Sequence, residues 1–491
     1  MNSKNDFFAK INNMKLKGIT NNSKKIDDNF IFVAVKGCKT DGHNYIEEAI
    51  KKGASVVVLE YLELKNKLEN KYPDVKFFLV KDTRKVLAQL SKWFYKKPDE
   101  EINIIGITGT NGKTTVSNLI AQYLEFSGKK TGIIGTLGYL INNKLIGEGR
   151  TTPDAIEWYK ILRLFADAEA EYVVAEISSH ALDQDRVYGT RFKGAVFTNL
   201  SSEHLDYHKN MENYFNAKLK LFRNISKDAS IIVNIDDKYG RIIAETFKDR
   251  KIFTYGQSSE AKLRIIDPKI TQDGISFLFQ WNNKHYKVVS GMLGEFNIYN
   301  LAASIGAILS LGFDPEFVVE KCSSLKPVKG RFQKVYSGKF TVIVDYAHTP
   351  EGLKSILTSI RNFSKGKIIT VFGAGGDRDR LKRPLMGKYA SELSDVVILT
   401  SDNPRSENPI NIIDDIKKGI KLKTKVIIEP DREGAIKTAI NMAEDKDVVL
   451  IAGKGHETYQ IIKNKTIHFD DVLIANKYVE KKLKDELNSK S

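Results

Sequence analysis

The sequence predicts an α/β protein of three domains built on largely parallel sheets. Two observations favour this class: short apolar runs alternate with helix-length segments, and a glycine-rich turn joins one such run to the helical pattern after it. Apolar runs of this kind are typical of strands covered by helices on both faces. They lie at residues 31–35, 55–59, 102–107, 172–175, 231–233, 340–344, 368–372, 396–399 and 448–452. Helix-length segments between them include residues 350–362 and 432–444.

Two proline-containing stretches are expected to separate the domains. Residues 96–101 are charged, and residues 325–330 contain Pro and Gly after a helical pattern. Such composition is typical of linkers. A chain of 491 residues is also long enough for about three domains of ordinary size. We therefore expect domains at residues 1–97, 98–325 and 326–491.

The composition limits the partners and the compartment. The chain has 77 Lys and Arg against 61 Asp and Glu, a net charge of +16. Such a charge is typical of proteins that bind nucleic acid, a membrane surface or an anionic substrate. No long basic block or aromatic platform is present, so we expect small-molecule substrates and no nucleic acid. Cys38 and Cys322 cannot build a disulfide framework. With no signal-like or membrane-spanning apolar stretch, we expect a cytoplasmic monomer without membrane anchoring.

A phosphate-binding loop follows the apolar run at 102–107. Residues 108–115 read TGTNGKTT, and a helical pattern comes next. Glycines let backbone N–H groups approach phosphate, the helix N-terminus adds positive potential, Lys113 neutralises charge, and Thr114 offers a hydroxyl to Mg²⁺. The general pattern G-x-x-x-x-G-K-[ST] fails at Ile107, whereas the narrower T-G-T-N-G-K-T is met in full. The ATP-binding residues expected here are Gly109, Thr110, Asn111, Gly112, Lys113, Thr114 and Thr115.

Polar residues follow the next two predicted strands. Glu176 comes directly after the run at 172–175, and His204 lies in TNLSSEHLDYH at residues 198–208. Open parallel sheets bind ligands beyond the carboxyl ends of their strands, so these residues should converge with the phosphate loop. A carboxylate can supply a hard oxygen ligand and an imidazole a nitrogen. The sequence therefore predicts a metal site beside the loop.

The narrow loop motif resembles that of the Mur ligase and folylpolyglutamate synthase superfamily, and the segments after it look like Mur ligases of the MurE type. The resemblance implies that Thr114 and Glu176 hold one Mg²⁺ and that His204 helps to hold a second. Lys218, in AKLKLF at 217–222, matches the family's carbamylated lysine, N6-carboxylysine, which CO₂ converts from a cation into an anion. One departure is Glu203, where the family usually has Asp.

The same resemblance implies roles at both substrate ends. Residues 22–24 read NSK instead of the usual DSR but keep the serine, which makes the first domain a UDP-binding module. The residues matched to the UDP-muramyl-dipeptide are Ser23, Cys38, Lys39, Thr40, Thr151, Thr152, Ser178, Gln184 and Arg186. Further ATP-side matches are Asn297, Asn300, Arg331 and Asp345. The residues expected to act in catalysis are Lys113, His204, Lys218 and Arg331, the last by stabilising charge on the transferred phosphate.

The segment SDNPRSE at residues 401–407 resembles the D-N-P-R motif of MurE enzymes that add meso-diaminopimelate. Lysine-adding relatives generally lack this arginine. Diaminopimelate has a distal carboxylate that lysine lacks, and a guanidinium can grip it through paired hydrogen bonds. The expected diamino-acid pocket is Arg378, Asp402, Asn403, Pro404, Arg405, Gly453 and Glu457.

The resemblance thus implies an ADP-forming amide ligase of peptidoglycan synthesis, and hence a role in cell-wall growth and division. The diamino acid is expected to bind in its C-terminal domain. ATP with Mg²⁺ would phosphorylate the D-glutamate side chain of UDP-N-acetylmuramoyl-L-alanyl-D-glutamate, and an amine of the diamino acid would attack the acyl phosphate. Lanthionine has the same two carboxylates and stays open as substrate. A lysine-adding or D-alanyl-D-alanine-adding ligase, a folylpolyglutamate synthase and, from another class, a nucleic-acid ATPase are the alternatives.

Overall fold

The computed structural model describes residues 8, 10–12, 14–37, 40–271, 273–421 and 423–488. Cys38 and Lys39, both expected near the uridine, lie outside the described residues. By compactness the chain divides into two units, residues 1–254 with 306–311 and residues 255–305 with 312–491. In the part of the chain described, no helix has the length and apolar character needed to cross a bilayer.

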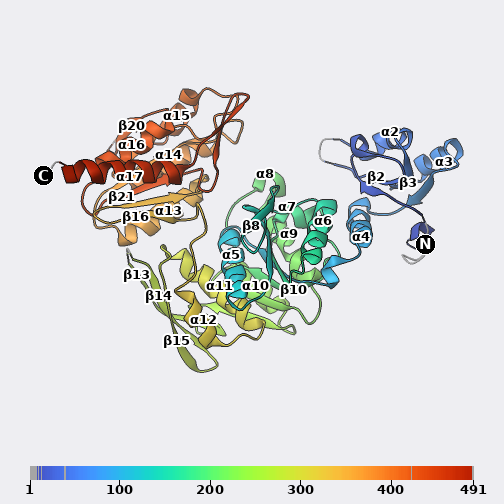
Figure 1. The fold of residues 1–491 in the computed structure, drawn as a ribbon, viewed down its shortest axis with the longest axis horizontal. Coiled ribbons are helices and arrows are strands. Elements are labelled where there is room, and N and C mark those ends of the chain that lie inside the picture. The colour runs from blue at the N-terminus through green and yellow to red at the C-terminus, as the bar shows by residue number, and fades with distance from the viewer. Residues whose placement is uncertain are drawn as a thin grey trace. The chain divides into compact units, whose positions relative to one another are not determined.

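The first sheet has four parallel strands in the order β1-β2-β3-β4 (Figure 1). Phe32, Val57, Leu59 and Leu68 are buried between this sheet and its helices, as expected for the runs at 31–35 and 55–59. The strands are β1 (Gly18–Thr20), β2 (Phe30–Val33), β3 (Ala54–Leu59) and β4 (Lys76–Leu79). The helices are η1 (Ser23–Lys25), η2 (Gly42–Tyr45), α2 (Ile46–Lys51), α3 (Leu62–Lys71), α4 (Thr83–Phe94) and η3 (Pro98–Glu100).

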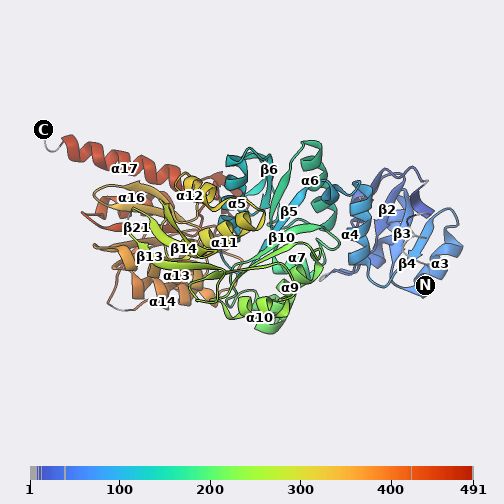
Figure 2. The same ribbon diagram turned by 90° about the horizontal axis from the view of Figure 1, so that it is seen from below.

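The central sheet of the first unit runs in the order β11-β10-β5-β9-β6-β7-β8. Its first five strands are parallel, although the sequence did not predict β6, and β7 and β8 add antiparallel hairpins that it did not predict either. Figure 2 shows α5 and α6 on one side of β5 and β10, and α9 and α10 on the other. The strands are β5 (Asn103–Thr108), β6 (Thr131–Gly135), β7 (Gly138–Ile141), β8 (Lys144–Gly147), β9 (Tyr172–Glu176), β10 (Phe192–Phe197) and β11 (Ser230–Asn234). The helices are α5 (Lys113–Phe126), α6 (Ala155–Asp167), α7 (Ser179–Asp183), α8 (Leu205–His208), α9 (Met211–Asn224) and α10 (Lys238–Thr246).

An antiparallel segment without any predicted strand follows. β12 (Ile252–Gly256) pairs in parallel with β13 (Leu263–Ile270), which continues antiparallel into β14 (Ile275–Trp281) and β15 (Lys284–Ser290). In β14 buried residues alternate with partly exposed ones. A search for continuous apolar runs misses such strands because only one face is covered. Helices α11 (Phe296–Ser310) and α12 (Pro315–Cys322) come next.

The last large sheet runs β16-β17-β21-β18-β19-β20 and is parallel except at β16. The two helices predicted at 350–362 and 432–444 are confirmed as α13 and α16. The strands are β16 (Gln333–Ser337), β17 (Thr341–Asp345), β18 (Ile368–Phe372), β19 (Val396–Leu399), β20 (Lys425–Ile428) and β21 (Val448–Ala452), with a hairpin of β22 (Tyr459–Ile462) and β23 (Lys465–His468). The helices are α13 (Pro350–Phe363), α14 (Lys382–Leu393), α15 (Pro409–Lys417), α16 (Arg432–Met442) and α17 (Asp471–Asn488).

A fully buried ion pair joins α16 to α17. Arg432 Nε and Nη2 donate to Asp471 Oδ1 and Oδ2 at 2.8 and 2.7 Å, and neither side chain is exposed. The same guanidinium donates to the carbonyls of Ser401 and Ala452 at 3.3 and 3.0 Å. It therefore ties both helix starts to the carboxyl ends of β19 and β21, where the diamino-acid motifs lie.

Arg432→Met is expected to lower the free energy of unfolding by about 3–5 kcal/mol, because Asp471 would remain buried without a counter-ion. The double variant Arg432→Met/Asp471→Leu should recover much of the loss. Urea unfolding of both variants measures the difference. A single variant as stable as the unmodified chain would contradict the assignment.

Candidate active site

The phosphate loop is shaped by two glycines at the end of β5. Gly112, at φ 88°, precedes the first residue of α5, Lys113. Gly109 has φ 152°, and a Cβ added there would lie 1.9 Å from Thr198 Oγ1. Neither position accepts a side chain without strain. Lys113 Nζ donates to the carbonyls of Gly109 and Thr110 at 3.0 and 2.8 Å, so the lysine lies over its own loop.

The segment after β10 holds this loop in place. Thr110 N donates to Asn199 O at 2.8 Å, and Asn111 N donates to Asn199 Oδ1 at 3.0 Å. Thr198 Oγ1 donates to Asn111 O at 2.6 Å. Because β10 is the parallel neighbour of β5, the carboxyl ends of both strands deliver these residues to one edge of the sheet. The expected convergence of the two segments is therefore confirmed.

Glu176 is a buried carboxylate beside the loop. It is 1% exposed, and its Oε2 accepts from Thr114 Oγ1 at 2.9 Å. Thr136, which the sequence analysis missed, donates through its N–H and its hydroxyl at 2.9 and 3.1 Å. Among the described residues no cationic side chain pairs with Glu176. A buried anion flanked by hydroxyl oxygens fits a hard divalent cation. Thr136 could have been found from its position directly after the neighbouring strand β6.

Lys218 is 1% exposed and lies against the phosphate loop. Its Nζ donates to Gly109 O at 2.7 Å and stands 4.6 Å from the ring centroid of Tyr214. Burial lowers its pKa well below the usual value, and Lys113 lowers it further. A buried neutral amine is the form that can react with CO₂, so the environment suits the modification expected there. The sequence alone would have placed this lysine on a solvated helix face.

His204 is the N-cap residue of the short helix α8. Its backbone is left-handed at φ 56°, and its ring centroid lies 6.2 Å from that of Tyr214. Burial lowers the pKa of His204, although Glu203, 3.7 Å away, opposes the shift. Within the described residues no three His, Cys, Asp or Glu side chains are arranged to hold a metal. The two-metal site of Thr114, Glu176, His204 and Lys218 stays a prediction.

The residues expected to bind the muramyl-peptide form one hydrogen-bond network. Thr152 Oγ1 donates to Glu176 O at 2.7 Å and accepts from Ser178 N at 3.0 Å. Arg186 Nη1 donates to Thr152 O at 2.8 Å, and its Nε and Nη2 donate to Gln184 Oε1 at 3.1 and 2.8 Å. Thr151 joins through a 3.1 Å contact between its hydroxyl and that of Thr136. The network therefore reaches Glu176, the buried carboxylate that is a candidate metal ligand.

Ser23 and Thr40 lie apart from this network, in the first domain. Ser23 is buried, and its hydroxyl donates to Glu48 Oε2 at 3.1 Å. Thr40 is exposed, and its carbonyl accepts from Gly37 N at 2.9 Å. No hydrogen bond among the described residues joins either residue to Thr152 or Arg186, so their roles stay predictions.

In the second unit, the asparagines expected on the adenine side are buried together. Asn297 Nδ2 donates to Leu293 O at 2.7 Å, and Asn300 Nδ2 donates to Asn297 Oδ1 at 2.9 Å, as their shared helix face predicts. Asp345 accepts from Phe332 N and Ala347 N at 2.6 and 2.7 Å, and burial raises its pKa against the opposing charge of Arg331.

Arg331 lies over the ring of Tyr346, with 4.6 Å between the guanidinium carbon and the ring centroid. Its Nε is buried and has no hydrogen-bond partner among the described residues. A buried donor without a partner is unfavourable unless a ligand satisfies it. The guanidinium is thus suited to binding an anion such as the transferred phosphate, the role expected for it.

The D-N-P-R turn and the segment at 453–457 meet around Asn403. Asn403 Nδ2 donates to Glu457 Oε2 at 2.9 Å, and Arg405 Nη1 donates to Gly376 O at 2.8 Å. Lys454, which the sequence analysis did not select, is fully buried and donates to Asn403 Oδ1 and Glu457 Oε2 at 3.3 and 3.1 Å. Lys454 could have been found from its position between Gly453 and Gly455, in a segment already expected to line the pocket.

The other expected members of this pocket line the same turn. Gly453 has φ 115°, and a Cβ there would lie 2.6 Å from Asp402 Oδ2. The Pro404 carbonyl leaves no room for a Cβ on Gly376, which would lie 1.9 Å away. Arg378 is exposed and donates to Asp377 O at 3.3 Å. The structure thus brings the turn and the 453–457 segment together through close backbone approaches.

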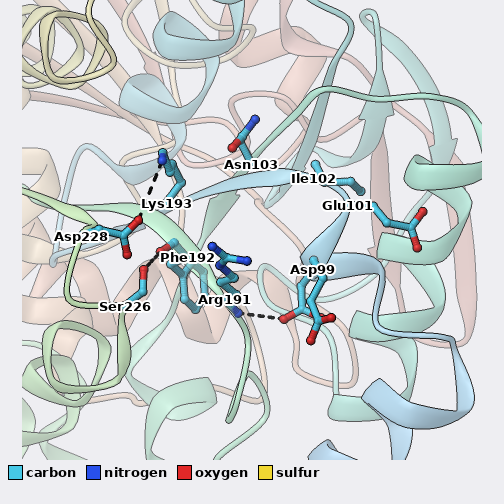
Figure 3. Close-up of a pocket in the computed structure, with 10 residues that line it drawn as sticks. Asp99, Glu101, Ile102, Asn103, Arg191, Phe192, Lys193, Ser226 and Asp228 are labelled. Atoms are coloured by element: carbon cyan, nitrogen blue, oxygen red, sulfur yellow. Dashed lines mark hydrogen bonds and ion pairs between the residues drawn. The ribbon is translucent and has the colours of Figure 1, made fainter.

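A polar pocket lies at the amino ends of β5 and β10, away from these residues (Figure 3). Asp99 is buried there, and its Oδ2 accepts from Arg191 N and Lys92 Nζ at 2.8 and 2.7 Å. None of the predicted site residues lines this pocket. Ligands of open parallel sheets bind at the carboxyl ends, so the pocket is not assigned to the reaction. Its lining residues are Asp99, Glu100, Glu101, Ile102, Asn103, Arg191, Phe192, Lys193, Ser226 and Asp228.

Comparisons with known proteins point to one family along most of the chain. Residues 15–95 match the catalytic domain of the Mur ligase family, residues 107–308 its middle domain, and residues 330–455 its glutamate ligase domain. A curated relative from Aquifex aeolicus, UDP-N-acetylmuramoyl-L-alanyl-D-glutamate–2,6-diaminopimelate ligase, is 48% identical over 461 residues. The match covers 94% of this chain and 93% of the relative.

Solved structures agree with this likeness. A structure of UDP-N-acetylmuramoyl-L-alanyl-D-glutamate–2,6-diaminopimelate ligase is 33% identical, with a TM-score of 0.70 and 95% of each chain covered. MurF ligase of Thermotoga maritima in complex with ADP is 20% identical at a TM-score of 0.61, covering 96% of this chain and 98% of that one, and shows a shared fold. This chain is 48% identical to a curated member over 94% of its own length, and it has the loop motif of that family in full. The chain therefore belongs to the Mur ligase family.

Proposed function

We propose that this chain is the ATP-dependent ligase that adds meso-diaminopimelate, or a close dicarboxylic diamino acid, to UDP-N-acetylmuramoyl-L-alanyl-D-glutamate. The observation that carries the proposal is Arg405, held at the carboxyl edge of a parallel sheet with Asn403 and Glu457 beside it. The relatives named for this reaction match the chain over almost its full length, which supports the same choice.

The reaction is a phosphoryl transfer followed by an acyl transfer. The D-glutamate side-chain carboxylate attacks the γ-phosphorus of ATP, ADP leaves, and an acyl phosphate forms. The amine of the diamino acid then attacks the carbonyl carbon, loses a proton, and phosphate leaves. Lys113 and Arg331 would stabilise charge on the phosphoryl group, and Arg186 would orient the muramyl-peptide.

Magnesium and a carbamate belong to the same proposal. Thr114, Glu176 and His204, with Lys218 in its carbamylated form, would hold Mg²⁺, which neutralises phosphate charge when bound. The buried carboxylate of Glu176, which no cationic side chain of the described residues pairs with, and the lowered pKa of Lys218 support this assignment.

The domain roles extend the proposal. We assign UDP-muramyl binding to residues 1–97, ATP binding and catalysis to 98–325, and diamino-acid binding to 326–491. The three family matches, at 15–95, 107–308 and 330–455, each fall inside one of these ranges and support them. Cytoplasmic location and a monomeric state stay predictions from the sequence.

Lys113→Ala should reduce ADP release by about 10²-fold or more, because the charge that neutralises the transferred phosphate is lost. ADP is measured at saturating muramyl-dipeptide and diamino acid. Lys129→Ala removes a lysine that pairs with Glu171 on the surface and is the matched control. Turnover near that of the control would contradict the ATP assignment.

Lys218→Ala should lose activity, and added bicarbonate should not restore it because no amine remains to carry the carbamate. Formate or acetate should restore part of the activity by supplying a carboxylate in its place. Labelling with carbon-13 bicarbonate should give a carbamate resonance in the unmodified chain only. Lys238→Ala, on the surface helix α10, is the control, and a fully active Lys218→Ala would exclude the carbamate.

Arg405→Ala should reduce kcat/KM for diaminopimelate far more than it affects ATP or the muramyl-dipeptide. We expect the preference for diaminopimelate over lysine, about 10²–10³-fold, to collapse, since the site rejects lysine by leaving Arg405 without its partner. Lanthionine keeps the distal carboxylate and should depend on Arg405 in the same way.

The measurement is kcat/KM for the three amino acids with the unmodified chain and the variant. Arg380→Ala is the matched control, because Arg380 is exposed and pairs with Glu407 at 2.9 Å in the same unit. An unmodified enzyme that prefers lysine, or unchanged ratios in Arg405→Ala, would show that the turn does not select the substrate.

A further inference from the structure

We infer that Tyr207 is a positioning residue for the muramyl-peptide, acting through Gln184 on the guanidinium of Arg186. This inference rests on the proposed function and adds a residue outside the motifs that led to it. Tyr207 lies in α8, the short helix whose N-cap is His204. It therefore connects the helix capped by His204, a candidate metal ligand, with the hydrogen-bond network of Gln184 and Arg186.

Both the ring and the hydroxyl of Tyr207 are held in place. The ring centroid lies 4.3 Å from that of His180 and 4.8 Å from that of His208. Tyr207 Oη donates to Asp183 Oδ2 at 2.9 Å, and Gln184 Nε2 donates to the same hydroxyl at 3.2 Å. The hydroxyl thus connects a carboxylate to a residue expected to bind substrate.

The carboxylate fixes the direction of these hydrogen bonds. Burial opposes ionisation of Asp183, yet the hydrogen bond from Tyr207 and the charge of Lys220 outweigh it and hold its pKa below the usual value. An ionised carboxylate only accepts, so the hydroxyl proton of Tyr207 is directed to Asp183. The hydroxyl oxygen then accepts from an N–H of Gln184, and the amide nitrogen must face Tyr207.

The orientation of Gln184 determines that of Arg186. With its nitrogen on Tyr207, the amide presents Oε1 to Arg186 Nε and Nη2, at 3.1 and 2.8 Å. Arg186 Nη1 donates to Thr152 O at 2.8 Å on the other side. Three of the five N–H donors of the guanidinium are thereby used within the described part of the chain, which leaves two for an anionic group of the peptide. A guanidinium held in this way loses little conformational freedom on binding.

Tyr207→Phe keeps the ring contacts and removes only the hydroxyl. The Gln184 amide can then turn over, and Arg186 loses a fixed acceptor. We expect KM for the muramyl-dipeptide to rise about 10-fold, while KM for ATP and for the diamino acid changes less than about 2-fold. Steady-state kinetics with each substrate varied in turn measure this split, which a general loss of stability would not produce.

A double-mutant cycle tests whether Tyr207 acts through Gln184. In a Gln184→Ala background, Tyr207→Phe should change KM for the muramyl-dipeptide by less than about 2-fold, because the connecting amide is already absent. Tyr478→Phe is the matched control. It removes a hydroxyl that donates to Glu433 Oε1 at 2.9 Å in the second unit, and it should leave all three KM values unchanged.

An unchanged KM for the muramyl-dipeptide in Tyr207→Phe would overturn the inference. So would additive effects of Tyr207→Phe and Gln184→Ala. An equal rise in KM for every substrate together with a lower melting temperature would overturn it as well. The unmodified chain is assayed first. If it fails to join the substrates, the proposed function falls together with this inference. If it joins them and Tyr207→Phe behaves identically, only the role of Tyr207 falls.

Discussion

The contact between the phosphate loop and the segment after β10 leaves no room for a side chain at Gly109. A Cβ there would overlap Thr198 Oγ1. The contact follows from the parallel register of β5 and β10, in which Thr108 lies beside Phe197. That register brings the loop and Asn199 together, and the Gly109 carbonyl then accepts from both Lys113 and Lys218. The positions of two lysine amines thus depend on one strand pairing.

Buried charges account for much of the remaining site. Glu176 is surrounded by hydroxyl and amide donors, and Lys218 meets a carbonyl and an aromatic ring. Isolated charges are costly to bury, so both groups require compensation. Under the proposed function a divalent cation compensates the Glu176 carboxylate, and carbamylation turns Lys218 into an anion that can be compensated in the same way. By contrast, Arg432 and Asp471 compensate each other and serve the fold.

The sequence predicted many of the parallel strands, because strands covered on both faces are continuous apolar runs such as 368–372 and 448–452, but it did not predict β6 or β20. It missed β13, β14 and β15, where one face is open and apolar residues alternate. The Thr114–Glu176 contact followed from a motif and a strand end. Thr136 and Lys454 had a local signal, directly after β6 and between two glycines, whereas Tyr207 had none, since Asp183 and Gln184 are distant from it in the sequence. Such pairings depend on strand order and helix packing, which local patterns do not contain.

Arg405 occupies a backbone conformation that arginine disfavours. Its φ is 50°, and its N–H and carbonyl are held by Ile461 and Lys463. A left-handed backbone costs a residue with a Cβ about 1 kcal/mol, which glycine would not pay. Under the proposed function, local stability and substrate recognition are therefore in conflict at this position. Substitution by glycine would relax the turn but discard the guanidinium, so under the proposed function selection for a carboxylate-bearing substrate retains the arginine.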